Sequence, residues 1–194
     1  MIEILVITSL VIFYILFIGR TISLARSGVK VIVLGGRKNL IDNLLENSTL
    51  PFLLLWTILI LLMTFNIEIP FIFELIIKNS YLPFIGVVLS YIGLIIFLSA
   101  LIAFGNSWRV GIDKDNQGEL ITNGIFKYSR NPIFLFMNIY FIGITLVYPT
   151  AIFILMTVIF MVGVHKQILN EEKHLEKIYK EDYQNYKEQT RRYL

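Results

Sequence analysis

The fold follows from residues 132–164, which read PIFLFMNIYFIGITLVYPTAIFILMTVIFMVGV. This stretch contains no Asp, Glu, Lys, Arg or His, and it is long enough for two membrane-spanning helices. Pro149 has no backbone N–H donor and disfavours helical backbone at Tyr148. We therefore predict a helical hairpin, with helices at 132–147 and 150–164 and a tight turn between them. Because each half is short for a span, we expect the pair to be tilted or off-centre in the bilayer.

Three further apolar runs precede the hairpin, at residues 2–19, 50–67 and 82–104. The chain has 194 residues, of which 56% are hydrophobic and 16% charged, and its mean hydropathy is +0.72. One soluble core of this size has no room for so much apolar surface, so the excess must face lipid. The sequence predicts an all-α, polytopic membrane protein with about five transmembrane helices. The run 69–77 is too short to cross, and we expect it at the membrane interface.

Lys and Arg residues are distributed between the loops in the way that sets membrane topology. With five spans, all of the 17 Lys and Arg residues except Lys78 fall on one side. We therefore expect the N-terminus outside and the C-terminus in the cytoplasm, in the inner or plasma membrane of a bacterium. The first apolar run is followed by Arg20 and has no basic segment before it, so we expect a retained span and not a removed signal peptide.

The tail, residues 165–194, has the pattern of a cytoplasmic amphipathic helix. One face is rich in Lys, and the other is an apolar stripe made up of Val164, Ile168, Leu175, Ile178, Tyr179, Tyr183 and Tyr186. We predict a single membrane domain over residues 1–194. Residues 1–104 would hold three spans, and residues 105–194 would hold a loop, the hairpin and the tail helix.

The composition excludes several kinds of site. The chain has no Cys, which rules out disulfides, thiolate metal sites and cysteine nucleophiles. Its two histidines, His165 and His174, are too few for a persuasive metal site. No G-x-G-x-x-G follows a strand, so a soluble nucleotide-binding domain is not present. We expect neither a metal nor a nucleic-acid partner.

Glu171 and Glu172 stand where the apolar stripe of the tail must pass. Two adjacent carboxylates near a membrane are costly unless cations or hydrogen-bond donors meet them. Two interpretations stay open. Either the pair forms an acidic helix turn paired with Arg109 or Arg130, or it receives the hydroxyl or ammonium groups of a polar ligand.

The segment Ser129-Arg130-Asn131-Pro132 has the pattern of a helix start. Asn131 suits the N-cap, and Pro132 suits the first helical position, where no amide donor is needed. Two interpretations stay open. The segment is either a structural helix cap, with Arg130 extended to the membrane interface, or a binding site for a carboxylate or phosphate. Since the hairpin returns the chain to the side it left, this segment and the glutamate pair must lie close together.

These residues resemble a known family. The segment GIFKYSRNPIF at residues 124–134 is similar to the Arg-His-Pro-x-Tyr region of the isoprenylcysteine carboxyl methyltransferases. The segment EEKHL at residues 171–175 is similar to their Glu-Glu-x-x-Leu element. The resemblance covers residues 105–194. The wider group includes bacterial membrane methyltransferases and phospholipid N-methyltransferases, all of which use S-adenosylmethionine.

The resemblance implies an S-adenosylmethionine site and no particular catalytic residue. The implied cofactor-binding residues are Leu120, Ile121, Gly124, Phe126, Arg130, Asn131, Pro132, Ile133, Phe134 and Glu171, with Glu172 in support. Asn131 replaces the family's histidine, but an asparagine side chain can still donate and accept hydrogen bonds. Gln167 stands where the family enzymes carry a substrate-facing arginine, so we expect it at the substrate, which need not be a prenylcysteine carboxylate.

Three functions are therefore hypotheses. The first is a membrane-embedded methyltransferase that uses S-adenosylmethionine and acts on a lipophilic small molecule or lipid, by O-methylation of a carboxylate or N-methylation of an amine. The second is a membrane oxidoreductase similar to the sterol reductases, but the Glu171-Glu172 pair disfavours it because the 2′-phosphate of NADPH prefers cations. The third is a non-enzymatic scaffold or small transporter, although the spans hold only mildly polar residues such as Thr57 and Asn138.

Overall fold

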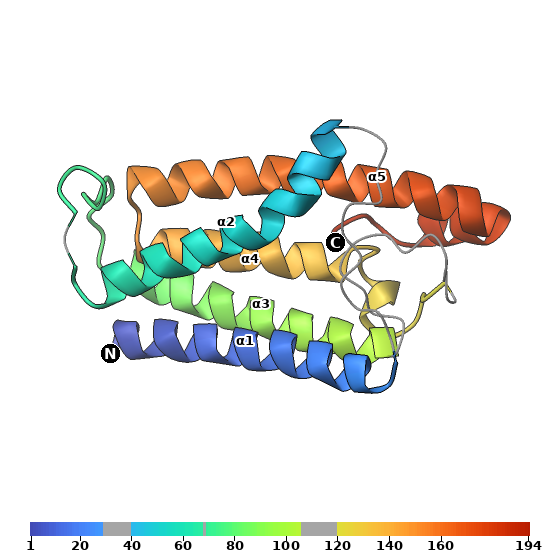
Figure 1. Cartoon of the computed structure of the whole chain (residues 1–194), viewed down its shortest axis with the longest axis horizontal. Helices are drawn as coiled ribbons and strands as arrows, with labels where there is room; N and C mark the ends of the chain where they lie inside the picture. The colour runs from blue at the N-terminus through green and yellow to red at the C-terminus, as the bar shows by residue number, and fades with distance from the viewer. Residues whose placement is uncertain (29–39, 68, 106–119) are drawn as a thin grey trace.

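The structure of the protein, a computed structural model, describes residues 1–28, 40–67, 69–105 and 120–194, with only the backbone described in 40–46. The elements are α1 (Ile2–Arg26), α2 (Leu40–Thr64), α3 (Leu82–Phe104), the 3-10 helix η2 (Gly124–Lys127), α4 (Pro132–Val147) and α5 (Ala151–Gln189). Helices α1, α3, α4 and α5 lie side by side, and α2 crosses them obliquely (Figure 1). The described residues form no β-strand, only one antiparallel bridge between Leu75 and Thr150. The chain is an all-α, polytopic membrane protein, as the sequence predicts.

Four of these helices, α1, α2, α3 and α5, are long and apolar enough to cross a bilayer. The fifth, α4, has 16 residues, and at ~1.5 Å per residue it extends for about 24 Å, less than the ~30 Å of the hydrocarbon core. The bounds of α3 and α4 agree with the prediction. Helix α1 continues past Arg20, and α2 begins at Leu40 and not at residue 50. Hydropathy marks only the lipid-facing part of a helix, so it misses such water-side turns.

The turn between α4 and α5 consists of Tyr148, Pro149 and Thr150, where the sequence predicts it. The backbone N–H of Ile76 donates to the carbonyl oxygen of Pro149 at 2.9 Å, so part of the segment 69–77 lies against this turn. The hydroxyls of Tyr148 and Thr64 share a hydrogen bond of 2.8 Å. These contacts hold the turn against α2 and the segment 69–77.

Helices α3 and α4 approach one another closely at two glycines. A Cβ atom added to Gly86 would lie 2.4 Å from the carbonyl oxygen of Gly143. A Cβ added to Gly143 would lie 2.5 Å from the hydroxyl oxygen of Ser90. Small residues at such a crossing let two membrane helices come into backbone contact. This contact fixes where α4, and with it the start of α4, stands relative to α3.

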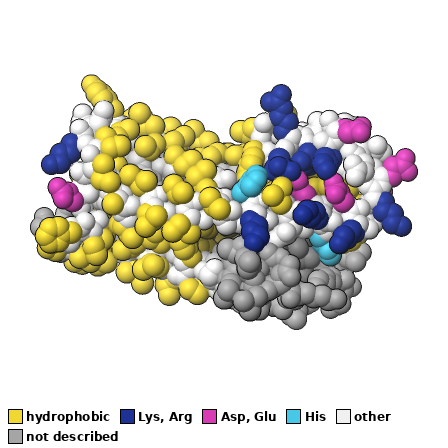
Figure 2. Space-filling view, turned by 90° about the horizontal axis from the view of Figure 1, so that it is seen from above, with side chains coloured by type: hydrophobic (Ala, Val, Ile, Leu, Met, Phe, Trp, Pro, Cys, Tyr) yellow, Lys and Arg dark blue, Asp and Glu magenta, His cyan; other side chains and the backbone are white. Residues whose placement is uncertain are grey.

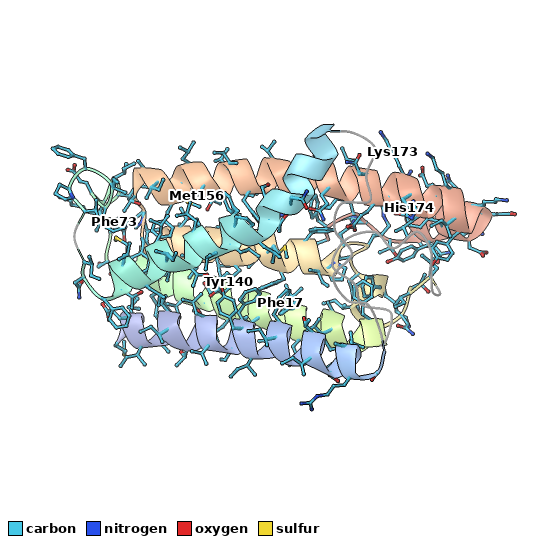
Figure 3. All side chains as sticks on the ribbon, viewed as in Figure 1. Phe17, Phe73, Tyr140, Met156, Lys173 and His174 are labelled. Carbon is cyan, nitrogen blue, oxygen red and sulfur yellow. The ribbon has the colours of Figure 1, made fainter. Side chains whose placement is uncertain are left out.

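Aromatic rings fill the core between the helices. Phe97 of α3 stacks on Phe136 of α4 with 4.5 Å between ring centroids, and Phe141 of α4 stacks on Phe160 of α5 at 3.9 Å. Tyr140 points into the interior of the bundle (Figure 3), where its hydroxyl shares a 3.0 Å hydrogen bond with Ser9 of α1. The four helices that lie side by side, α1, α3, α4 and α5, therefore share one aromatic core.

Helix α5 changes direction at Lys180, whose backbone is non-helical, with φ 44° and ψ −115°. Beyond it the chain turns back beside the preceding part of α5 (Figure 1). Lys187 consequently forms an ion pair with Glu176, and the Tyr186 hydroxyl donates to the carbonyl oxygen of Phe126 at 2.7 Å. The sequence predicts a hairpin helix at 150–164 and an amphipathic helix in the tail, residues 165–194. In the structure one helix runs through both, and the break lies within the predicted tail.

The surface is divided along the length of the bundle. Hydrophobic side chains cover one part, and most described charged side chains gather at the opposite end (Figure 2). Lys173 and His174 of α5 lie at this charged end (Figure 3). The division is that of an integral membrane protein with one extensive water-side region.

Candidate functional site

A cavity of about 210 Å³ lies between α1, α2, α4 and α5. Its charged and polar lining comes from the start of α4, from α5 and from Ser48 and Thr49 of α2. Its apolar lining includes Phe13, Phe17, Phe52, Phe97, Met137 and Phe160. We call these two parts the polar end and the apolar end of the cavity. The polar end is near the charged end of the bundle, and the apolar end lies among the membrane helices.

One face of α5 contributes Gly163, Gln167 and Glu171 to the cavity. The three residues are four positions apart, which places them above one another on a helix. Glu172 follows Glu171 directly, but it does not line the cavity, and only 5% of its surface is exposed. The two glutamates therefore have different surroundings: Glu171 lines the cavity, and Glu172 is buried beside it.

Glu172 lies in a buried ion cluster with two arginines. Its Oε1 accepts hydrogen bonds from Arg130 Nη2 at 2.9 Å and Nε at 3.2 Å. Its Oε2 accepts from Arg192 Nη2 at 2.8 Å and Nε at 3.1 Å. Burial by itself raises the pKa of the Glu172 carboxyl, but the hydrogen bonds from Arg192 and Arg130 outweigh it and hold the pKa below its usual value. Glu172 is therefore ionised at neutral pH, and Arg130 is one of the two partners that the sequence suggests for the glutamate pair.

Asn131 is the N-cap of α4 and Pro132 is its first residue, as predicted, but the Asn131 side chain does not cap the helix. Its Nδ2 instead donates to Glu172 Oε1 and to the carbonyl oxygen of Arg192, both at 3.2 Å. Because both partners are acceptors, the amide nitrogen must face them. The backbone N–H groups of Ile133 and Phe134 have no partner within the helix and belong to the stretch that lines the cavity.

Phe126 of η2, in the loop that precedes α4, also lines the cavity. Its ring lies edge-on to Phe104 of α3, with 4.7 Å between centroids, and the side chain is 4% exposed. Leu120 and Ile121 pack against the same small cluster and do not line the cavity. Gly124 has a φ of +58°, a conformation that glycine adopts without strain, and it lies against Ala103. Leu120 and Ile121 therefore support Phe126, and none of the three residues lines the cavity.

Most of the residues that the sequence singles out line this one cavity. They are Phe126, Arg130, Asn131, Pro132, Ile133, Phe134, Gln167 and Glu171. Leu120, Ile121, Gly124 and Glu172 lie behind them, and Arg109 lies outside the described residues. Within the described part of the chain, no group of three or more His, Asp or Glu side chains is placed to hold a metal ion.

Sequence reasoning missed the contribution of the first two helices. Phe13 and Phe17 of α1 and Ser48 and Thr49 of α2 all line the cavity. The signal available for α2 is a polar stretch, Asn47-Ser48-Thr49, directly before an apolar span. The aromatic residues of α1 carry no such signal, because Phe is equally common on a lipid-facing surface.

A family model described as phospholipid methyltransferase matches residues 82–182, slightly more than half of the 194 residues. The chain belongs to this family. Comparisons with curated proteins and with solved structures gave no match. The protein is therefore an integral membrane member of a methyltransferase family, in agreement with the resemblance noted above.

The phospholipid methyltransferase match begins with α3 and ends just after the bend in α5. It includes the start of α4 and both glutamates, so it spans the polar end of the cavity from both sides. Helices α1 and α2 and residues 183–194 lie outside the match. These outer parts nevertheless supply Phe13 and Ser48 to the cavity and Arg192 to the ion cluster.

Proposed function

We propose that the protein is an S-adenosylmethionine-dependent methyltransferase, with the cofactor at the polar end of the cavity and a lipophilic acceptor at the apolar end. One observation carries the proposal. Asn131 at the start of α4 and Glu171 of α5, which are 40 positions apart, line the same cavity. Methyltransferase family membership supports methyl transfer over a membrane oxidoreductase and over a non-enzymatic scaffold or transporter.

The polar end offers groups that fit such a cofactor. The carboxylate of Glu171 would accept hydrogen bonds from an ammonium or from ribose hydroxyls. The N–H groups of Ile133 and Phe134, at the positive end of the α4 dipole, would hold a carboxylate. Phe126 and Phe134 supply flat apolar surface for a base. When bound, S-adenosylmethionine would supply a methyl group carried on a positively charged sulfur.

The apolar end fits an acceptor that arrives from the membrane. Its lining is aromatic and thioether, which suits an acyl or prenyl chain. Leu50 of α2 and Ile159 of α5 both line the cavity, and 39% and 55% of their surfaces are exposed. Residues that are both exposed and cavity-lining mark an opening, so we propose that the acceptor enters from lipid between α2 and α5. The cavity is smaller than the ~300–1,000 Å³ of typical ligand pockets, so a chain-like acceptor would extend out through this opening.

The residues that line the cavity would position the reacting atoms and exclude water from them, and they would supply little acid–base chemistry. Methyl transfer is an in-line displacement, which depends on a fixed approach between the reacting atoms. The aromatic wall keeps the apolar end dry, and no buried proton-transfer group is needed for a carboxylate acceptor, which is already ionised at neutral pH. An amine acceptor would have to lose its proton first. We therefore name no catalytic base, and Gln167 remains the residue that we propose to lie beside the acceptor.

Titration of the purified protein with S-adenosylhomocysteine tests the cofactor site. We expect the unchanged protein to bind the ligand and Glu171→Ala to show no binding at millimolar concentration. The variant removes the carboxylate on α5 that we propose accepts hydrogen bonds from the cofactor. Glu181→Ala is the matched control, since Glu181 is an exposed carboxylate of α5 beyond the bend. If Glu171→Ala is folded and binds as well as the unchanged protein, the cofactor site is wrongly assigned. NADPH should not compete.

The acceptor class needs a separate experiment. Membranes that contain the protein would be supplied with cofactor labelled on the methyl group and with a lipid extract, and the lipids that gain one methyl group would be identified by mass spectrometry. Lipids with an amine headgroup and lipids ending in a carboxylate form the two arms. Absence of label in both arms, with the cofactor bound, would contradict a lipid acceptor.

A further inference from the structure

The last turn of α5 and the segment that follows it lie against the start of α4. The backbone N–H of Arg130 donates to the carbonyl oxygen of Arg191 at 3.0 Å. The Nη1 of Arg130 donates to the carbonyl oxygens of Lys187 and Thr190, at 3.1 and 2.6 Å. The hydroxyl of Tyr193 shares a 2.9 Å hydrogen bond with Nδ1 of His165 on α5. The segment is therefore fixed to both sides of the polar end, although the family match ends at residue 182.

Arg192 adds the charge that completes the buried cluster. The side chains of Glu172 and Arg130 are 6% and 7% exposed, and that of Arg192 is 33% exposed. Both oxygens of the Glu172 carboxylate are used, one by each arginine. A buried carboxylate requires such pairing, because an ion without partners in a low-dielectric site is strongly disfavoured. Without Arg192, one oxygen of Glu172 would lose both of its side-chain donors.

The same residue also holds Asn131 in place. The carbonyl oxygen of Arg192 and Oε1 of Glu172 accept the two N–H bonds of the Asn131 amide. An asparagine amide has two N–H donors, so these two contacts fix its orientation and leave Oδ1 as its remaining hydrogen-bonding atom. Asn131 lines the cavity, whereas neither Glu172 nor Arg192 does. Arg192 therefore acts on the cavity only through its neighbours.

We infer that Arg192 is a positioning residue for the cofactor: by pairing with Glu172 and accepting from Asn131, it sets the spacing between the start of α4 and Glu171 of α5. The inference rests on the proposed function for the identity of the ligand. It extends the site to a residue that lies ten positions past the end of the family match. The spacing itself is a property of the chain and is measurable without any ligand.

The test compares Arg192→Gln with Arg191→Gln, its matched control. Arg191 is the next residue in the chain, and its side chain is exposed, so the control removes the same charge and leaves the cluster intact. We expect Arg192→Gln to bind S-adenosylhomocysteine at least about tenfold more weakly, the order of a lost charge-assisted hydrogen bond. Arg191→Gln should bind as the unchanged protein does. Arg192→Lys keeps the charge and should restore part of the lost affinity, which a general loss of folding would not allow.

A second readout needs no ligand. The chain has no Cys, so spin labels can be placed on cysteines introduced at two exposed positions, Tyr128 before α4 and Lys173 beside Glu172. We expect the distribution of distances between the labels to broaden in Arg192→Gln and to stay narrow in Arg191→Gln. If Arg192→Gln changes neither the affinity nor the distances, the inference is overturned. If the unchanged protein binds no S-adenosylhomocysteine but the distances still broaden, the proposed function fails and the positioning role stands.

Discussion

At the scale of single residues, the polar end is organised around an asparagine in an unusual role. An N-cap asparagine ordinarily accepts a hydrogen bond from the first turn of its helix. Asn131 donates to Glu172 and to the backbone of Arg192 instead, and the first-turn amides beside it keep no cap. Helix α4 therefore lacks the stabilisation of a side-chain cap, and the residues of its uncapped first turn, Ile133 and Phe134, line the cavity. Under the proposed function, these first-turn amides would bind the carboxylate of the cofactor.

Glu172 gives a prediction about stability and pH. Glu172→Gln removes the charge between two arginines and leaves both cations close together, so we expect a loss of about 3–5 kcal/mol at pH 7, as for other broken buried pairs. The native pKa of Glu172 lies below its usual value, so its contribution is fully present above about pH 4.3 and is lost as the pH falls through the native pKa. The difference in melting temperature between the unchanged protein and Glu172→Gln, both in detergent, should therefore shrink below about pH 4. An equal difference at pH 7 and in acid would contradict this assignment.

The sequence predicts part of this cluster and not the rest, for a physical reason. Two adjacent carboxylates near a membrane require donors, and Arg130 is one of two residues that the sequence offers for that purpose. The second donor, Arg192, is twenty positions from Glu172, and it comes close only because the chain reverses at Lys180. No local pattern marks that reversal: Lys180 is not a glycine, yet it adopts a positive φ of 44°.

At the scale of the elements, hydropathy and proline placement predict the hairpin, because both act locally. Residues 132–147 form α4 as expected, and the turn at Pro149 is where the backbone donor is missing. The tail was expected to be an amphipathic helix, and the structure has helix on both sides of Lys180, with a change of direction that the pattern does not indicate. The apolar stripe continues on both sides of the bend, because Tyr183 and Tyr186 are buried against Phe126 and not against the membrane-side core. A continuous stripe therefore does not distinguish one helix from two that pack on different neighbours.

The crossing of α3 and α4 gives a prediction at this scale. Gly86→Ala places a methyl group 2.4 Å from a backbone oxygen of α4, so the two helices must separate. We expect a loss of about 1–3 kcal/mol, the usual range for overpacking, and a lower melting temperature. Gly19→Ala is the control, because nothing lies within 4 Å of a Cβ at that position of α1. Equal melting temperatures for the two variants would show that the crossing is not as tight as the structure has it.

At the scale of the whole molecule, the division of polar and apolar surface agrees with the division of the cavity. The charged end of the bundle (Figure 2) holds the start of α4, the ion cluster and the polar end of the cavity. The apolar end lies among helices whose outer faces are hydrophobic, such as α5 with Leu155, Val158 and Val162 exposed. A water-soluble cofactor and a lipid-soluble acceptor could therefore reach one site from two different phases. Under the proposed function, the depth of the cavity determines where the cofactor and the methyl acceptor would come into contact.

The orientation of the chain in the membrane is the last prediction, and it decides from which compartment the cofactor comes. The positive-inside rule places the end with Arg130 and Arg192 in the cytoplasm and Lys78 outside. In a chain without native Cys, Lys78→Cys and Glu188→Cys each introduce one exposed thiol at opposite ends of the bundle. A maleimide that cannot cross membranes should label Lys78→Cys in intact cells, and Glu188→Cys only after the cells are opened. The reverse pattern would put the polar end of the cavity outside, where S-adenosylmethionine is not made, and would count against both the orientation and the proposed cofactor.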